Sequence, residues 1–268
     1  PTVTGGELMT LDLQEAQIEI ACKELKLPGL RQQFRALARE AVDKEMDYAH
    51  FLRACLEQEL HDRHQKKQQT LLRQAKFPSP KTLADFDFTK APQLPKMKIL
   101  KLAEGAFVKR HENVFCIGKV GTGKSHIAVA LGMAVLQAGY RVRFTTVMQL
   151  LQELQLAEAE YRLPRYLKTW DKVNLVILDE FGYVPLGDNS KLLFHFISRR
   201  YEQGSLIITS NLEFSRWVEV LQDPALTSAL LDRLTHHSHI LLFEGESYRF
   251  RERLTHLENE REVKNSTP

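Results

Sequence analysis

The chain has 268 residues, of which 43% are hydrophobic and 26% are charged, so it can bury one large core or two modest ones. Its formal net charge of +3 permits a nucleic-acid partner but does not require one. Three widely separated cysteines, Cys22, Cys55 and Cys116, form no Cys-x-x-Cys pair, which argues against a zinc site or a disulfide framework and favours reduced thiols. Because no apolar run approaches the roughly 18 residues that span a bilayer, and because the N-terminus lacks the apolar core of a signal peptide, we expect a cytoplasmic protein with no membrane partner.

The first quarter of the chain is predicted to be helical. Between residues 11 and 74, apolar side chains recur at steps of three and four, the spacing of amphipathic helices, and Pro28-Gly29 breaks the first of them. Four prolines punctuate the segment that follows: Pro78, Pro80, Pro92 and Pro95. We therefore expect an all-helical N-terminal domain, a linker, a larger domain and a flexible polar tail, over residues 1–77, 78–96, 97–259 and 260–268.

From residue 97 on, short apolar runs alternate with helical patterns. Each run is nearly continuous in apolar residues, as in a strand that is buried on both faces of a sheet. The runs are Val114–Ile117, Val142–Thr145, Asn174–Leu178, Leu206–Thr209 and His239–Phe243. This alternation predicts an α/β fold in which helices cover both faces of a parallel sheet.

A phosphate-binding loop follows the first of these runs. The sequence Gly118-Lys119-Val120-Gly121-Thr122-Gly123-Lys124-Ser125 matches the pattern G-x-x-x-x-G-K-[ST] at every fixed position, and a helical pattern begins directly after it. Glycines let the backbone N–H groups wrap around phosphate oxygens. Lys124 is expected to reach the β- and γ-phosphates, and the Ser125 hydroxyl is expected to hold Mg²⁺. A P-loop NTPase that binds ATP or GTP with Mg²⁺ is predicted.

Two acids end the third apolar run and complete the predicted magnesium site. Asp179 and Glu180 follow Asn174–Leu178 directly, which places both carboxylates at the carboxyl edge of the sheet, where ligands of α/β proteins bind. We expect Asp179 to orient Mg²⁺ through its water shell. Glu180 is expected to polarise the attacking water, a role that phosphoryl transfer requires.

Two further polar residues leave alternatives open on the residues alone. Asn211 follows the run Leu206–Thr209 and can hold the same water, or it can serve a turn or a helix cap. Arg233 lies near the end of a helical pattern that begins at Pro224. Its guanidinium can stabilise charge on a transferring phosphate, but a solvated arginine at a helix end is the simpler interpretation.

The segment Gly118–Ala128, together with Leu178-Asp179-Glu180-Phe181-Gly182-Tyr183-Val184-Pro185-Leu186, resembles the IstB branch of the AAA+ ATPases. These are helper ATPases encoded beside a transposase in bacterial insertion sequences, and the helicase loader DnaC is similar. The resemblance covers about residues 10 to 257. One departure is Lys119-Val120, where many relatives carry a proline after the first glycine.

The resemblance implies roles for individual residues. It makes Asn211 a sensor of the γ-phosphate and Arg233 an arginine finger that reaches into the site of the adjacent subunit. His126 joins the nucleotide-binding residues 118–125, and Arg249 matches a second sensor, with Arg251 as a nearby rival.

The resemblance also implies a homo-oligomer with ATP bound between its subunits. Such an oligomer would assemble on duplex DNA, hydrolyse ATP as a switch and deliver the DNA to a cognate transposase. Three alternatives stay open: a replicative helicase loader of the DnaC type, a small-molecule phosphotransferase, and a DNA-architectural binder that uses ATP for assembly.

Two basic clusters could contact DNA phosphates. The first consists of Arg63, Lys66, Lys67, Arg73 and Lys76. The second consists of Arg162, Arg165 and Lys168, interleaved with Tyr161, Tyr166 and Trp170. A solvated helix face explains either cluster equally well.

Overall fold

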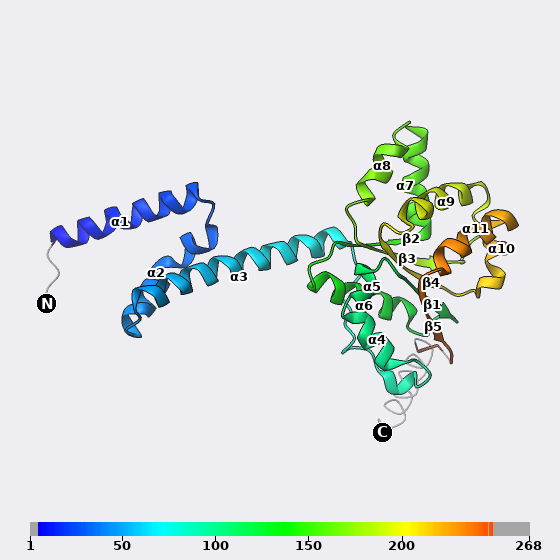
Figure 1. The fold of residues 1–268 in the computed structure, drawn as a ribbon, viewed down its shortest axis with the longest axis horizontal. Coiled ribbons are helices and arrows are strands. Elements are labelled where there is room, and N and C mark those ends of the chain that lie inside the picture. Colours follow the sequence, from blue (N-terminus) through cyan, green and yellow to red (C-terminus); the bar gives the residue numbers. More distant parts are fainter. Residues whose placement is uncertain (1–4, 246, 249–268) are drawn as a thin grey trace, which may run out of the picture. The chain divides into compact units, whose positions relative to one another are not determined.

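The computed structural model describes residues 5–245 and 247–248 (Figure 1). The chain forms two compact units, and the division falls between Thr70 and Leu71, inside a helix. The predicted tail over 260–268 lies outside the described residues. None of the helices in the described ranges combines the length and the apolar character needed to cross a membrane.

The first unit consists of three helices, as the periodicity predicts. They are α1 (Gly5–Glu24), α2 (Pro28–Asp43) and α3 (Tyr48–Ala75), the last of which continues past the division. The carboxylate of Glu59, which is almost fully buried, accepts hydrogen bonds from the Leu30 amide at 3.0 Å and from Arg63 Nε at 2.7 Å. It thereby satisfies a free N–H at the start of α2 and fixes that helix against α3.

The second unit begins with a segment that packs on its core. Leu71 and Ala75 are buried there, and Phe77, Leu83 and Phe86 pack against the same cluster. A short 3-10 helix, η1 (Phe88–Lys90), follows. The residues 78–96, which the prolines predict as a linker, are therefore attached to the second unit, because their apolar side chains lose water-exposed area there. The predicted domain boundary near residue 78 itself stays a prediction.

The second unit is built on a five-stranded parallel sheet in the order β2-β3-β4-β1-β5. The strands are β1 (Asn113–Gly118), β2 (Val142–Thr146), β3 (Leu175–Phe181), β4 (Ser205–Ser210) and β5 (Ser238–Phe243). These are the five apolar runs of the sequence, so the predicted α/β fold is confirmed. Because all strands run the same way, the residues that follow β1, β3 and β4 meet at one edge of the sheet.

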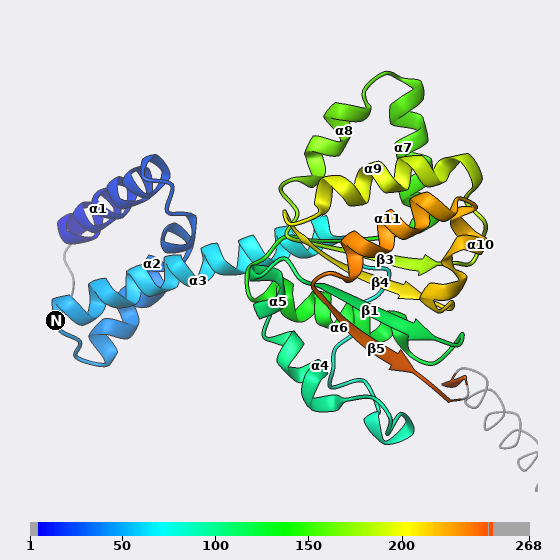
Figure 2. The same ribbon diagram turned by 45° about the vertical axis from the view of Figure 1, so that its right-hand side comes forward.

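Helices cover both faces of the sheet (Figure 1, Figure 2). One face carries α4 (Lys96–Ala103), α5 (Ala106–Lys109) and α6 (Lys124–Gln137). The other carries α7 (Val147–Ala159), α8 (Leu163–Trp170), α9 (Ser190–Arg200), α10 (Trp217–Leu221) and α11 (Pro224–Thr235), with the short helices η2 (Gly187–Asn189) and η3 (Phe214–Arg216) between them. Alternate residues of each central strand enter the two cores: Val114 and Cys116 enter one, Phe115 and Ile117 the other. This is why the strands read as continuous apolar runs.

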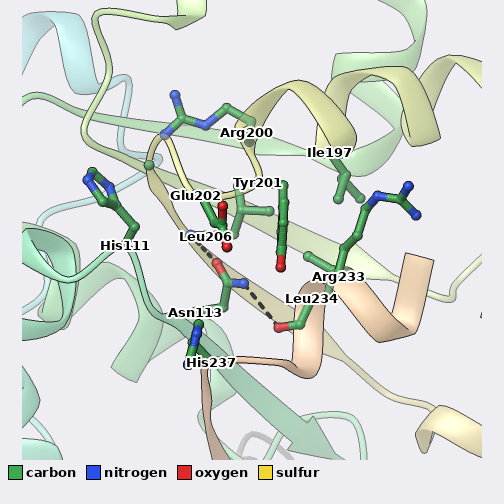
Figure 3. Close-up of a pocket in the computed structure, with 11 residues that line it drawn as sticks. His111, Asn113, Ile197, Arg200, Tyr201, Glu202, Leu206, Arg233, Leu234 and His237 are labelled. Atoms are coloured by element: carbon green, nitrogen blue, oxygen red, sulfur yellow. Dashed lines mark hydrogen bonds between the residues drawn. The ribbon is translucent and has the colours of Figure 1, made fainter. Parts of the chain in front are cut away.

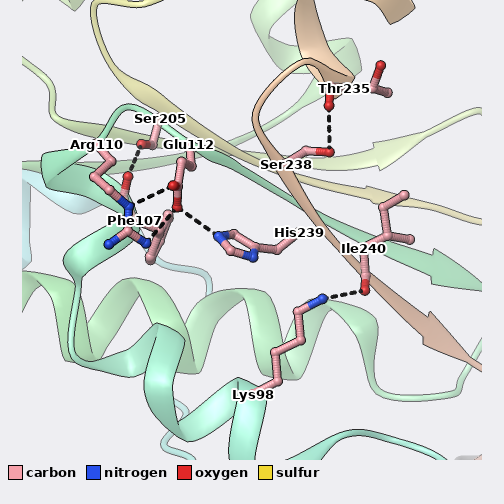
Figure 4. A network of polar contacts seen from close by, with 9 residues as sticks. All are labelled: Lys98, Phe107, Arg110, Glu112, Ser205, Thr235, Ser238, His239 and Ile240. Atoms are coloured by element: carbon pink, nitrogen blue, oxygen red, sulfur yellow. Dashed lines mark hydrogen bonds and ion pairs between the residues drawn. The ribbon is translucent and has the colours of Figure 1, made fainter.

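Polar contacts tie together the edge of the sheet at which the strands begin (Figure 4). Glu112 accepts two hydrogen bonds from Arg110 and lies 2.8 Å from Nε2 of His239 on β5. Next to it, the side-chain amide of Asn113 donates to the Leu234 carbonyl and accepts from the Leu206 amide, at 3.0 and 2.9 Å. Strands β1, β4 and β5 are therefore held in register at this edge by side chains as well as by the backbone ladder.

Candidate nucleotide-binding site

The loop between β1 and α6 has a backbone shape that its glycines make possible. Gly121 and Gly123 have φ values of +80° and +96°, in the left-handed region that other residues avoid. Gly118 lies so close to β5 that a Cβ there would be 1.9 Å from the Phe243 carbonyl oxygen. The amide of Tyr248 donates to the Gly121 carbonyl at 2.9 Å, so the chain that follows β5 also holds the loop.

Lys124 is buried in the loop, with only 6% of its surface exposed. Its ammonium donates to the Lys119 carbonyl at 2.6 Å, and the Thr122 hydroxyl donates to the same carbonyl at 2.8 Å. A buried positive charge at the N-terminus of the 14-residue helix α6 favours an anion. The structure thus places Lys124 where a phosphate group would replace a backbone carbonyl as its partner.

Ser125 and Asp179 come together, as the sequence predicts. The Ser125 hydroxyl donates to Asp179 Oδ1 at 2.8 Å, and the Thr209 hydroxyl on β4 donates to the same oxygen. A hydroxyl and a carboxylate beside a phosphate loop are the hard oxygen ligands that Mg²⁺ prefers. Within the described ranges, no group of three or more His, Cys, Asp or Glu side chains could hold a metal. The pair of Ser125 and Asp179 nevertheless fits Mg²⁺, because this ion usually keeps several waters and binds substrate phosphates.

Glu180 is exposed at the end of β3 and has a left-handed backbone, with φ +66°. This conformation is uncommon for a residue other than glycine. Seven further non-glycine residues of the described ranges have a positive φ, but Glu180 is the one of these eight that lies in a strand. The left-handed backbone turns the side chain out over the sheet edge, where Glu180 lines the pocket. The carboxylate is therefore available to a water at the phosphate.

The pocket beside the loop has a volume of about 370 Å³. Besides the loop and Glu180, its wall contains Lys81, Asp85, Phe86, Asp87, Lys90, Ala91, His126, Tyr183, Thr209, Glu244 and Tyr248. Phe86 rests on Gly123, where a Cβ would be 2.7 Å from the ring. His126 Nε2 lies 3.0 Å from the Thr82 carbonyl oxygen, which ties this wall to the start of α6.

Sequence reasoning missed this wall, because the prolines around it made the segment look like a linker. The signal that could have found it is the aromatic pair Phe86 and Phe88, whose ring centroids lie 4.9 Å apart. Hydrogen bonds from the Thr82 side chain and amide lower the pKa of Asp85, so the wall carries a carboxylate.

Behind the sheet edge, burial raises the pKa of the Cys116 thiol, which keeps the thiol neutral beside Asp179.

Asn211 follows β4, and its side-chain oxygen is buried without a hydrogen-bond partner among the described residues. A Cβ on Gly182 would approach that oxygen to 3.0 Å. Asn211 therefore lies behind Gly182, near the end of β3, and is not one of the described residues that line the pocket. A buried amide oxygen without a partner can accept a hydrogen bond from a bound water.

Arg233 lies at the opposite edge of the sheet, in a second cavity that includes the starts of β1 and β4 (Figure 3). Its guanidinium donates to the Ala229 carbonyl at 2.8 Å and lies over the Phe194 ring at 5.0 Å. Figure 3 shows it directed away from Asn113, His111 and His237. The whole length of β1, about 16 Å at about 3.3 Å per residue, separates this edge from the loop of the same chain.

The remaining predicted residues divide into three groups. Arg249 and Arg251 lie outside the described residues. In the first basic cluster, Arg63 is already paired with Glu59. In the second cluster, Arg162 pairs with Glu160, and Trp170 is 1% exposed beneath Arg143, which excludes it from stacking on a base.

The strand order, the phosphate loop after β1 and the acids at the end of β3 define the class of protein. It is an ATP-binding protein of the AAA+ class of P-loop nucleotide-binding proteins. The crystal structure of the DnaC helicase loader has the same fold, with a TM-score of 0.50 and 22% identity over 55% of this chain and 87% of that one. AMPPCP-bound DnaA from Aquifex aeolicus has a TM-score of 0.52 and 21% identity over 68% and 56%.

Within that class, the chain belongs to the IstB-like ATP-binding protein family, which matches residues 20–256. The insertion sequence IS21 putative ATP-binding protein of Pseudomonas aeruginosa is 41% identical over 238 residues, which are 88% of this chain and 90% of that protein. The insertion sequence IS5376 putative ATP-binding protein of Geobacillus stearothermophilus is 39% identical, over 87% of this chain and 93% of its own. The predicted family is thereby confirmed.

Proposed function

We propose that this protein hydrolyses ATP as a switch, assembles as a homo-oligomer on duplex DNA and recruits a transposase for insertion-sequence transposition. The observation that carries the proposal is the division of the site. Lys124, Ser125, Asp179 and Glu180 gather at one edge of the sheet, whereas Arg233 lies at the other. Relatives named as ATP-binding proteins of insertion sequences support the biological setting.

Four residues at this edge of the sheet have tasks in phosphoryl transfer. Lys124 exchanges the Lys119 carbonyl for phosphate oxygens and keeps them in place. Ser125, and Asp179 through water, would hold Mg²⁺, which neutralises phosphate charge when bound. Glu180 accepts a hydrogen bond from the attacking water and orients it toward the phosphate.

Arg233 acts on the nucleotide of a neighbouring copy. Its helix ends at the edge of the sheet where β1 begins, whereas the loop of the same chain follows the end of β1, so Arg233 is placed for the site of another copy. An arginine donated in trans stabilises the charge that develops on the transferring phosphate and links hydrolysis to assembly. Asn211, beside Gly182, senses whether that phosphate is present.

The variant Glu180→Gln tests the switch. We expect it to bind ATP and duplex DNA as the native protein does, but to lose ATP turnover, because the amide is a poor acceptor for the water. Glu213→Gln, an exposed acid away from the pocket, is the control and should keep native turnover. ATP hydrolysis at the native rate in Glu180→Gln would remove Glu180 from the mechanism.

A titration of duplex DNA with ATP, with ADP and without nucleotide tests the assembly on DNA. We expect the protein to bind duplex DNA tightly, and its particle mass to grow, with ATP only. Light scattering or sedimentation measures the particle mass. Pull-down experiments then identify the partner. The protein is offered the transposase encoded by the same insertion sequence and, as a competitor, a replicative helicase. Capture of the helicase instead of the transposase would favour a helicase loader.

A further inference from the structure

The ladder between β3 and β4 is interrupted where the acids stand. Leu178 pairs with Ile208, and the next pair is Phe181 with Ser210, so β3 contains one residue more than β4 in this stretch. Such a bulge kinks the strand and re-aims a side chain. The extra residue allows Asp179 to face the loop while Glu180 turns outward.

Thr209 lies opposite this bulge and contacts both acids. It is 2% exposed, and its hydroxyl donates a hydrogen bond to Asp179 Oδ1. The hydroxyl oxygen of Thr209 also accepts a hydrogen bond from the backbone amide of Glu180 at 3.0 Å. A hydroxyl has one proton to donate and lone pairs to accept with. Donation to Asp179 therefore fixes the orientation in which a lone pair meets the Glu180 N–H.

We propose that Thr209 is a positioning residue that holds the metal-site carboxylate and the water-orienting acid in one fixed arrangement. The inference deepens, and rests on, the proposed ATP hydrolysis. Ser125 and Thr209 both donate to Asp179 Oδ1, so the carboxylate keeps its rotamer with or without a metal. The same hydroxyl compensates the amide that the bulge takes out of the ladder, which supports the left-handed backbone of Glu180.

The methyl group and the hydroxyl of Thr209 have separable tasks. The β-branched side chain suits a buried strand, and valine has nearly the same shape. Thr209→Val therefore removes the hydroxyl with little change in packing, whereas Thr209→Ser keeps the hydroxyl. Thr145→Val is the matched control, because Thr145 is a threonine buried on β2 whose hydroxyl donates to a backbone carbonyl instead.

Two readouts test the arrangement without hydrolysis. The first is binding of a fluorescent ATP analogue across a Mg²⁺ titration, with EDTA as the metal-free point. For Thr209→Val we expect native affinity in EDTA and an increase of about 10- to 100-fold in the Mg²⁺ concentration needed for half of the metal effect. The second is hydrogen exchange of the nucleotide-free protein, in which the Glu180 amide should exchange faster in Thr209→Val.

Turnover provides the third readout. The kcat of Thr209→Val should fall by about 10- to 100-fold, while Thr209→Ser and Thr145→Val stay near native in all three measurements. The proposal is overturned if Thr209→Val keeps native Mg²⁺ dependence and exchange. It is equally overturned if Thr209→Ser loses as much as Thr209→Val, because packing would then be the cause.

The outcomes separate this inference from the proposed function. A native protein that binds ATP with Mg²⁺ but does not hydrolyse it contradicts the proposed function, yet the Mg²⁺ titration and the exchange of Glu180 still decide on Thr209. Thermal melting of each variant identifies a folding defect. Should Thr209→Val melt early, Thr209→Ala is measured as a second variant without the hydroxyl and is judged by the same criteria.

Discussion

At the scale of single residues, Gly118 shows how little room the loop has. A side chain there would run into the backbone of Phe243, not into a side chain that could move. Gly139 also has a positive φ, of +93°, but nothing lies within 4 Å of the place of its Cβ. The two glycines therefore separate the cost of a clash from the cost of backbone strain.

We predict that Gly118→Ala lowers the free energy of unfolding by about 3 kcal/mol and abolishes ATP binding. Gly139→Ala should cost about 1 kcal/mol and leave ATP binding intact. Urea denaturation and nucleotide titration measure both effects. Equal destabilisation by the two substitutions would contradict the close approach of β5 to the loop.

Glu112 predicts a pH dependence. Hydrogen bonds from Arg110, and then from His239, lower its pKa to about 2 from an ordinary value of 4.5. A lowered pKa in the folded state adds stability that is fully present above the unfolded pKa and is lost as the pH falls from 4.5 toward 2.

We therefore expect Glu112→Gln to lower the free energy of unfolding at pH 7 by about 1 kcal/mol. The difference from the native protein should shrink progressively below pH 4.5. Denaturant unfolding at several pH values measures it. Glu104→Gln, an exposed acid in the same region, should show no such dependence, and a difference that persists unchanged at low pH would refute the pairing.

At the scale of elements, the start of helix α11 is fixed by Asp223 and Pro224. Asp223 accepts a hydrogen bond from the Leu226 amide at 2.9 Å, and Pro224 occupies the first helical position. An N-cap and a proline at these places are a recognised start signal. The helix they begin ends at the far edge of the sheet and carries Arg233 there.

Asp223→Ala should lower the free energy of unfolding by about 1 kcal/mol and the Tm by about 2–4 °C. The loss arises because the Leu226 amide loses its partner at the helix start. Asp188→Ala, a nearby exposed acid in η2, should stay within about 0.5 kcal/mol of native. Scanning calorimetry compares them, and an unchanged Tm in Asp223→Ala would exclude this cap as a stabilising contact.

The strands and the loop could be predicted from sequence, because their signals are local. An apolar run such as Leu175–Leu178 indicates a buried strand. Its place in the sheet also sets the place of the acids that follow it. The aromatic pair Phe86 and Phe88 could have indicated an ordered segment, but its packing on Gly123 could not be predicted, since Gly123 lies far along the chain. Thr209 was hidden for a similar reason: its two partners stand on another strand, and the bulge that brings them together leaves no pattern in the sequence.

At the scale of the whole molecule, the second unit presents two different functional edges. One contains the pocket with Glu180, and the other contains Arg233. Under the proposed function, a chain built in this way completes its site only with a second copy. Hydrolysis should therefore depend on protein concentration, and it should reach its full rate only in the assembled state.

Arg233→Ala should bind ATP normally and lose hydrolysis by about 10³-fold or more at concentrations at which the native protein is assembled. Arg216→Ala, which removes an exposed arginine paired with Glu219, is the control and should hydrolyse normally. Mixing Arg233→Ala with Glu180→Gln should restore part of the activity, because each supplies what the other lacks. If Arg233→Ala lost as much hydrolysis in isolated subunits as in the assembled state, donation of the arginine in trans would be contradicted.

The separation of Arg233 from its own loop by the length of β1 has a consequence for the ends of an assembly. A contact between two unlike edges is head-to-tail, so a row of copies has a direction and stays open unless its rotation closes a ring. In an open row, the pocket at one end receives no arginine. That terminal copy would keep its ATP longest, as a cap does at the growing end of a filament. The lifetime of the row on DNA would then be governed by addition at that end, not by the average hydrolysis rate along it.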